Sequence, residues 1–181
     1  MKKKICYILI MLLSFCLLSA QTNSEGFDGF SWNTTISEFL NKYPSSKETT
    51  GKNEEERNER TFQRSTDSVI RVYRFFDNKL YWGRTVYEDP NYETEEAVLE
   101  KLIETYGQFY DSNKWTENNK EYFSIWKDIS PTLSIELTEI KYFNSYGRST
   151  GKHLFITYEN EQIGKNADEY YKNQKKKNIE L

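Results

Sequence analysis

The sequence predicts an α+β fold in which helices pack on one face of an antiparallel sheet. Two amphipathic helical patterns each precede a series of strand-like runs, and short polar turns join those runs. Strands connected by tight turns must run antiparallel, because a parallel pair needs a long crossover. Helices that precede whole groups of strands favour a helical layer against a single sheet.

The first twenty residues have the three parts of a secretion signal. A basic start precedes an apolar run over residues 5–18, and small residues follow at Ser19 and Ala20. This order is typical of a cleaved signal peptide, and the run is shorter than the roughly 20 apolar residues of a membrane span. We therefore expect residues 1–20 to be a signal peptide and the mature protein, beginning at Gln21, to be periplasmic or secreted.

Both cysteines lie inside this segment, at positions 6 and 16. Cys16 stands at the end of the apolar run, so an alternative is a lipoprotein anchored to a membrane through that residue. Phe15 argues against it, because signal peptidases need small residues there; a retained anchor is the third alternative. A mature chain without cysteine excludes catalysis by a cysteine nucleophile.

The expected mature chain is acidic and of single-domain size. Removing residues 1–20 takes away three lysines and no acids, so the formal charge becomes 22 minus 28, or −6, over 161 residues. An acidic protein repels phosphate backbones, so we expect no nucleic-acid partner. The 4 Trp, 14 Tyr and 11 Phe residues supply bulky material for a core. The Lys/Asn/Ile-rich composition indicates a bacterial protein.

The first half begins with a polar stretch, 21–29, which we expect to be a flexible lead-in. A short amphipathic helix follows; Thr34 or Thr35 can cap it, and Pro44 ends it. Its apolar residues stand at helical spacing: Ile36, Phe39, Leu40 and Tyr43. Residues 45–60 contain no large apolar side chain, so the sequence predicts a solvated loop there.

Three strands are then expected, at 61–64, 69–76 and 80–87. Asp77-Asn78-Lys79 makes a hairpin turn between the last two. Strict alternation places Leu80, Trp82, Arg84 and Val86 on one face of strand 80–87, and Tyr81, Gly83, Thr85 and Tyr87 on the other.

The second half opens with the clearest helix, 94–106, which Thr94 should cap and Gly107 should end. Its apolar stripe consists of Ala97, Val98, Leu99, Leu102, Ile103 and Tyr106. Strands are expected at 113–116, 122–128, 133–140 and 154–159, with a turn over 143–153. Residues 161–181 are charged and should form a tail or a short helix.

The order of elements therefore repeats within one α+β domain, 30–160. The two helices end 63 residues apart, at Tyr43 and Tyr106, which suggests a tandem duplication with units 30–90 and 91–160.

The opening Trp32-Asn33-Thr34-Thr35 with Glu38-Phe39 resembles the W-G-T/S-x-x-E-V start of many small bacterial envelope proteins. The order of a helix followed by a meander is similar to that of the SmpA/OmlA-type outer-membrane assembly lipoproteins and of β-lactamase-inhibitory protein, which carries two such units. The resemblance implies a protein-binding role without catalysis. Asn33 replaces the usual glycine, and the shared motif transfers no functional residue.

Motifs for catalysis and phosphate binding are weak. One histidine, His153, leaves little for a Ser/His/Asp site, and we expect an ordinary surface or edge residue. Gly147 and Gly151 are separated by three residues where a phosphate-binding loop has four, and His153 replaces its Ser/Thr. A hydrolase with carboxylates assembled only in space is the third functional alternative, because such spacing is invisible in a sequence.

Metal sites and cofactors are not expected. No Cys/His cluster exists for zinc. Five acidic or amide residues match the positions of a calcium loop, but Thr94 stands where that loop needs glycine, so the acids more simply favour a helix N-terminus. The residues concerned are Asp89, Asn91, Glu93, Glu95 and Glu100. Asn33-Thr34-Thr35 is formally a glycosylation sequon but fits helix entry in a bacterial protein.

The candidate binding residues are sheet aromatics: Tyr73, Tyr81, Tyr87 and Trp126. One interpretation, which we favour, is that they are half-exposed and stabilise cross-strand pairs. The other is a binding platform, since such side chains combine a large contact area with a polar tip. We expect a non-enzymatic envelope protein that binds another protein through its sheet or loops; the alternative is a peptide- or carbohydrate-binding module with an aromatic sheet face.

Overall fold

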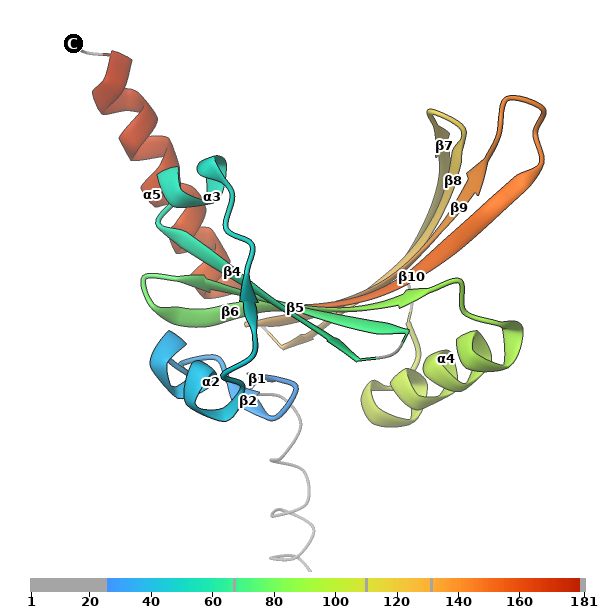
Figure 1. The fold of residues 1–181 in the computed structure, drawn as a ribbon, viewed down its shortest axis with the longest axis horizontal. Coiled ribbons are helices and arrows are strands. Elements are labelled where there is room, and N and C mark those ends of the chain that lie inside the picture. The colour runs from blue at the N-terminus through green and yellow to red at the C-terminus, as the bar shows by residue number, and fades with distance from the viewer. Residues whose placement is uncertain (1–25, 67, 110, 131, 180–181) are drawn as a thin grey trace, which may run out of the picture.

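The computed structural model describes residues 26–179 except positions 67, 110 and 131, and it confirms the α+β class. Across these residues the main feature is an eight-stranded antiparallel sheet with the strand order β3-β4-β5-β6-β10-β9-β8-β7 (Figure 1). A separate two-stranded ribbon, β1–β2, precedes it. The strands are β1 (Gly26–Phe27), β2 (Phe30–Ser31), β3 (Lys47–Glu48), β4 (Glu59–Thr66), β5 (Val69–Phe76), β6 (Lys79–Glu88), β7 (Asp111–Glu117), β8 (Lys120–Ser130), β9 (Leu133–Phe143) and β10 (Ser149–Asn160). The helices are α2 (Ile36–Lys42), α3 (Lys52–Glu56), α4 (Tyr92–Tyr106) and α5 (Glu161–Ile179).

The sheet consists of two meanders joined edge to edge. Strands β4–β6 form the first and β7–β10 the second, and β6 pairs with β10 from Trp82↔Glu159 to Glu88↔His153. Helix α2 precedes the first meander and α4 the second, and both lie on the same side of the sheet (Figure 1). A helix followed by a group of antiparallel strands therefore occurs twice, as the sequence predicts. That the two units arose by duplication stays a prediction.

Helix α2 begins where its capping residues place it. The Thr35 hydroxyl accepts a hydrogen bond from the Glu38 backbone N–H at 3.3 Å, and Glu38 Oε2 accepts one from the Thr35 N–H at 2.8 Å. This reciprocal capping box satisfies two backbone donors that a helix start leaves unpaired. Phe39 in the next turn is fully buried and anchors the helix to the sheet.

The core on the helix side of the sheet is mostly aromatic beneath α2. The Phe39 ring packs against five aromatic rings, with centroid distances from 4.6 Å to Tyr73 up to 5.8 Å to Tyr43. The other three rings are those of Phe30, Phe62 and Phe75. Tilted and edge-to-face pairs of this kind add to the burial of area. Beneath α4 the core is aliphatic, with Leu102, Leu133, Ile135, Leu137, Leu154 and Ile156.

The expectation of a flexible lead-in over 21–29 is wrong for its described part. Phe27 is 5% exposed, and its ring lies between Tyr73 of the first meander and Tyr158 of the second, at 5.2 and 5.5 Å. A Cβ at Gly83 would lie 2.1 Å from the Phe27 ring, so only glycine leaves room for it in the sheet. The turn between β1 and β2 has positive φ at both Asp28 and Gly29, as two-residue hairpins prefer.

The segment 45–60 contains more structure than the predicted loop. It forms β3 and α3, and the α3 residues are all at least partly exposed, in keeping with their polar composition. Glu59 at the start of β4 is buried; its Oε1 accepts hydrogen bonds from Arg57 Nε and from the Tyr81 hydroxyl, both at 3.0 Å. A buried carboxylate is tolerated when it is paired in this way.

Helix α4 starts two residues before the predicted position. Asn91, rather than Thr94, is the N-cap, because its Oδ1 accepts the Thr94 backbone N–H at 2.8 Å. Gly107 ends the helix with a φ of 78°, as predicted for that glycine. Leu102 is 4% exposed, whereas Ala97 of the predicted stripe is exposed.

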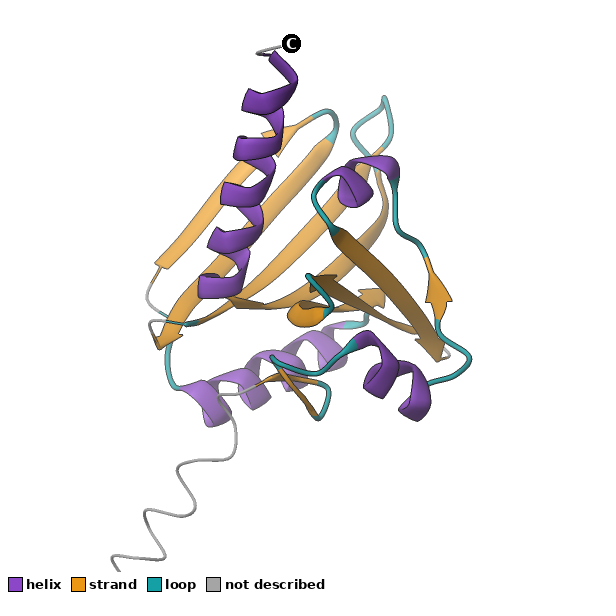
Figure 2. Cartoon of the chain, turned by 90° about the vertical axis from the view of Figure 1, so that its left-hand side faces the viewer, coloured by secondary structure: helices purple, strands orange, loops and turns teal. Residues whose placement is uncertain are grey.

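The C-terminal segment forms α5, a 19-residue helix, where the sequence predicted a tail or a short helix. It lies on the side of the sheet away from α2 and α4 (Figure 2). The expectation that the helices pack on one face of the sheet is therefore wrong for α5, because the sequence did not indicate a long helix there. Gly164 lies close to Tyr81 and Glu159, and Tyr170 contacts the Phe76 ring at 5.8 Å. In the described part of the chain, none of the helices has the length and apolar character that a membrane span requires.

Candidate functional site

The face of the sheet opposite α2 and α4 is the first candidate site. Side chains directly opposite each other on paired strands point to the same side, so the strand registers define this face. We call its part beyond α5 the open face: Trp115, Tyr122, Ser124, Trp126, Glu136, Thr138, Ile140, Tyr142, His153, Phe155, Thr157, Trp82, Arg84 and Val86. The β7–β10 meander bends toward this side, so the face is concave (Figure 1).

Two tryptophans stand out at the β7–β8 end of the open face. Trp115 and Trp126 are 39% and 37% exposed. Trp115 stacks flat on Tyr122, with ring centroids 4.8 Å apart and an angle of 2° between the planes. Rigid aromatic surfaces that remain accessible are typical anchors of protein interfaces.

A polar group lies toward the centre of the same face. The Arg84 guanidinium packs over Trp82 and Phe155, 4.7 and 5.3 Å from the ring centroids, and its Nε donates to Thr157 Oγ1 at 3.0 Å. Burial lowers the pKa of Arg84 from its ordinary value, which still leaves an arginine charged at neutral pH. The neighbouring Ser124 hydroxyl donates to Glu136 at 2.5 Å.

His153 belongs to the open face as well. Its Nδ1 lies 2.9 Å from the Tyr142 hydroxyl, and its ring meets Phe155 edge-on at 5.8 Å. The residue is half-buried on β10, opposite Glu88 of β6. It is therefore a strand residue rather than part of the predicted turn.

Of the four predicted binding residues, only Trp126 lies on the open face. Tyr73 is fully buried on the helix side, with its hydroxyl donating to Asp28 at 2.5 Å. Tyr81 is 3% exposed beside α5, and Tyr87 packs against the core on the helix side. The expectation that these tyrosines are half-exposed on one sheet face is wrong for Tyr73 and Tyr81.

A β-bulge explains the error for Tyr81. Arg74 of β5 pairs with Trp82 but the next residue, Phe75, pairs with Leu80, so Tyr81 is an extra residue in the ladder. A bulge of this kind interrupts the two-residue alternation of side chains, on which the predicted faces of strand 80–87 were based. Leu80 consequently lies in the core on the helix side, and Tyr81 turns toward Glu59 on the other side.

Sequence reasoning missed Trp115 and Tyr122, although a signal for their pairing was present. Asn118-Asn119 forms a two-residue turn with both φ values positive, at 49° and 59°. Such a turn fixes the register of its hairpin, and here it places Trp115 opposite Tyr122.

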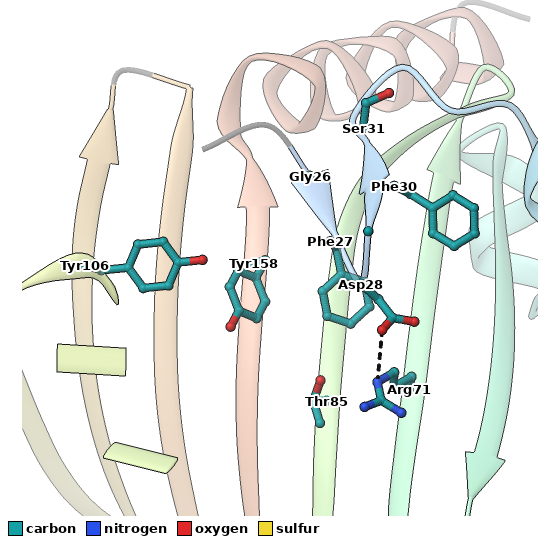
Figure 3. A pocket seen from close by; sticks show the side chains of 10 residues that line it. Gly26, Phe27, Asp28, Phe30, Ser31, Arg71, Thr85, Tyr106 and Tyr158 are labelled. Carbon is teal, nitrogen blue, oxygen red and sulfur yellow. Dashed lines mark ion pairs between the residues drawn. The ribbon is translucent and has the colours of Figure 1, made fainter. Parts of the chain in front are cut away.

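A cavity of about 550 Å³ on the helix side is the second candidate site (Figure 3). It lies between the β1–β2 ribbon and the last residue of α4, Tyr106. Its floor carries Arg71, Thr85 and Tyr158, and among the described residues that line it Asp28 is the one carboxylate.

Three residues of the calcium-loop pattern have other roles in the structure. Asp89 Oδ1 accepts the Lys152 backbone N–H at 2.9 Å, Asn91 caps α4, and Glu95 forms an ion pair with the Lys152 ammonium. Over the described positions, no three His, Cys, Asp or Glu side chains are grouped closely enough to hold a metal ion.

Comparisons of this chain with models of protein families, with curated proteins and with solved structures found no match. The resemblance to the envelope proteins therefore stays a prediction that rests on the short opening motif and on the order of elements.

Proposed function

We propose that the protein is an exported bacterial envelope protein that works by binding another protein rather than by catalysis, and that it binds through the open face. The observation that carries the proposal is the pair of accessible tryptophans on a concave sheet face. Trp115 is held flat by Tyr122, so little side-chain freedom would be lost on binding. Interfaces are enriched in such aromatic anchors.

The polar centre of the open face supports a protein partner. The Arg84 guanidinium packs against the rings of Trp82 and Phe155. An arginine in such a position can stack on aromatic rings and donate hydrogen bonds at the same time. Hot spots of protein interfaces are enriched in aromatic residues and arginine, and the centre of the open face contains both. The alternative is a carbohydrate- or peptide-binding module, favoured by the flat Trp115–Tyr122 stack, which offers a planar surface to a sugar ring.

We expect the double variant Trp115→Ala/Trp126→Ala to lose its partner. Buried anchors each carry about 2 kcal/mol or more of binding, so affinity should fall by at least roughly 30-fold per residue. Folding should suffer little, because both side chains are more than one-third exposed. The measurement is retention of envelope proteins by the tagged variant in a pull-down, with thermal melts to verify the fold.

The matched control is Tyr92→Ala/Tyr146→Ala, which removes two exposed aromatics, 70% and 88% accessible, that lie outside the open face. Its partner retention should equal that of the unmodified protein. Equal retention by the tryptophan variant would refute the open face as the binding surface. Tryptophan-dependent retention on a polysaccharide matrix, without a protein partner, would favour the carbohydrate alternative.

For export, we expect the mature protein to start at Gln21. The small residues Ser19 and Ala20 after the apolar run motivate this cleavage site. Intact-mass measurement of the protein isolated from the envelope tests it. A mass that includes a lipid on Cys16 would contradict it and would indicate a membrane-anchored lipoprotein.

A further inference from the structure

The cavity on the helix side is separate from the open face and is built by both halves of the sheet. Arg71 comes from β5, Thr85 from β6 and Tyr158 from β10, while Phe27 of the ribbon and Tyr106 of α4 form the walls (Figure 3). Its volume of about 550 Å³ is in the range of small-molecule sites, which measure roughly 300–1,000 Å³.

The charge beside the cavity is unbalanced toward positive. Asp28 accepts a hydrogen bond from the Tyr73 hydroxyl at 2.5 Å. The guanidinium groups of Arg64 and Arg71 each lie 3.4 Å from a carboxylate oxygen of Asp28. The Lys42 ammonium also lies near this turn, 4.4 Å from the centroid of the Phe30 ring. Among the described residues, the positive groups around the β1–β2 turn therefore outnumber the Asp28 carboxylate, which favours an anionic ligand.

Arg71 is the arginine with free donors. Arg64 stacks on Tyr43, 3.3 Å from its ring centroid, and also donates to the Tyr73 hydroxyl. Arg71 faces Asp28 only through Nε; within the described part of the chain, neither of its terminal nitrogens has a hydrogen-bond acceptor. Its side chain is 33% exposed. The guanidinium fork can therefore form the paired hydrogen bonds with which arginines hold carboxylates.

Aromatic surfaces occupy the other side of the cavity. The rings of Tyr106 and Tyr158 meet edge-on at 6.4 Å, and Phe27 lies 5.5 Å from Tyr158. Burial raises the pKa of both tyrosines, so their hydroxyls stay protonated at neutral pH and can donate hydrogen bonds. These groups can contact a ligand that has a hydrocarbon chain or a ring and that carries a hydrogen-bond acceptor.

We propose that this cavity binds a small organic monocarboxylate, with the carboxylate on Arg71 and a ring or hydrocarbon body against Tyr106 and Tyr158. A planar carboxylate fits the paired donors of the guanidinium fork, and Asp28 repels a doubly charged phosphate more strongly than a monoanion. One strand separates β5 from β10, so the two ends of the site lie about 10 Å apart, which sets the ligand's length.

Titration calorimetry with hippurate, 4-hydroxyphenylacetate and hexanoate tests the proposal. At least one of these probes should bind saturably, and its neutral amide should bind about tenfold more weakly or worse, because the charge-assisted bonds to Arg71 are lost. Arg71→Gln should weaken the same probe by a similar factor. Arg148→Gln is the matched control, since Arg148 is exposed in the β9–β10 turn, and it should leave binding unchanged.

NMR amide chemical shifts of the unmodified protein provide a second test, which remains valid even if Arg71→Gln does not fold. The bound probe should shift the amides of residues 26–31, 71, 85 and 158. The proposal fails if no probe saturates below about 10 mM, if amides bind as well as acids, or if the shifts cluster elsewhere. Tighter binding of inorganic phosphate than of every carboxylate would also overturn it.

Discussion

Replacing Phe39 with alanine is expected to lower the free energy of unfolding by about 3–5 kcal/mol, the usual loss for a buried phenylalanine. The ring is fully buried and packs against five aromatic rings, from the ribbon, from the C-cap of α2 and from strands β4 and β5. Its removal would leave a cavity lined by rigid rings that cannot collapse easily. Native domains are stable by only about 5–15 kcal/mol, so this loss is a large share of the total.

Urea melts of Phe39→Ala against the unmodified protein measure the loss. Tyr146→Ala is the control: this aromatic is 88% exposed in the β9–β10 turn, and its loss should stay within about 0.5 kcal/mol. A loss below about 1 kcal/mol for Phe39→Ala would contradict the aromatic core as described.

Leu102→Ala should be the next most damaging change, costing about 2–5 kcal/mol. Leu102 is 4% exposed and is the buried contact of α4 with the core under the second meander. Alanine has a higher helix propensity than leucine, so the lost free energy of unfolding would reflect the loss of packing and not a weaker helix.

Lys101→Ala is the matched control on the same helix. The side chain of Lys101 is 76% exposed and pairs only with Glu104, a surface contact of little energetic value. Denaturant melts should show a change within about 0.5 kcal/mol for this variant. Equal losses for Leu102→Ala and Lys101→Ala would mean that the helix face is assigned wrongly.

Periodicity was enough to predict the elements that local patterns dictate. The stripe ending at Tyr106 identified α4, and the polar turn at Asp77-Asn78 identified the β5–β6 hairpin. These features depend on residues close in the chain, because caps, turns and helical faces are local interactions. The α+β class followed from their order.

The candidate sites needed contacts between distant segments. The β-bulge at Tyr81 is defined by how β5 pairs with β6, and one extra residue moved that side chain to the other side of the sheet. The sequence placed Phe27 in a polar lead-in. In the structure its ring fills the space over Gly83 and packs between Tyr73 of the first meander and Tyr158 of the second. Nothing in residues 21–29 alone indicates that partner.

By itself, the sequence determined the class of fold, the positions of most helices and strands, and the large share of aromatic residues in the core, because these follow from local periodicity and composition. The tertiary structure alone decided which face each aromatic occupies, that α5 covers one end of the sheet, and that Arg71, Tyr106 and Tyr158 line one cavity. The reason is physical: burial and charge pairing depend on strand register and on segments far apart in the chain, and a single bulge is enough to redirect a side chain.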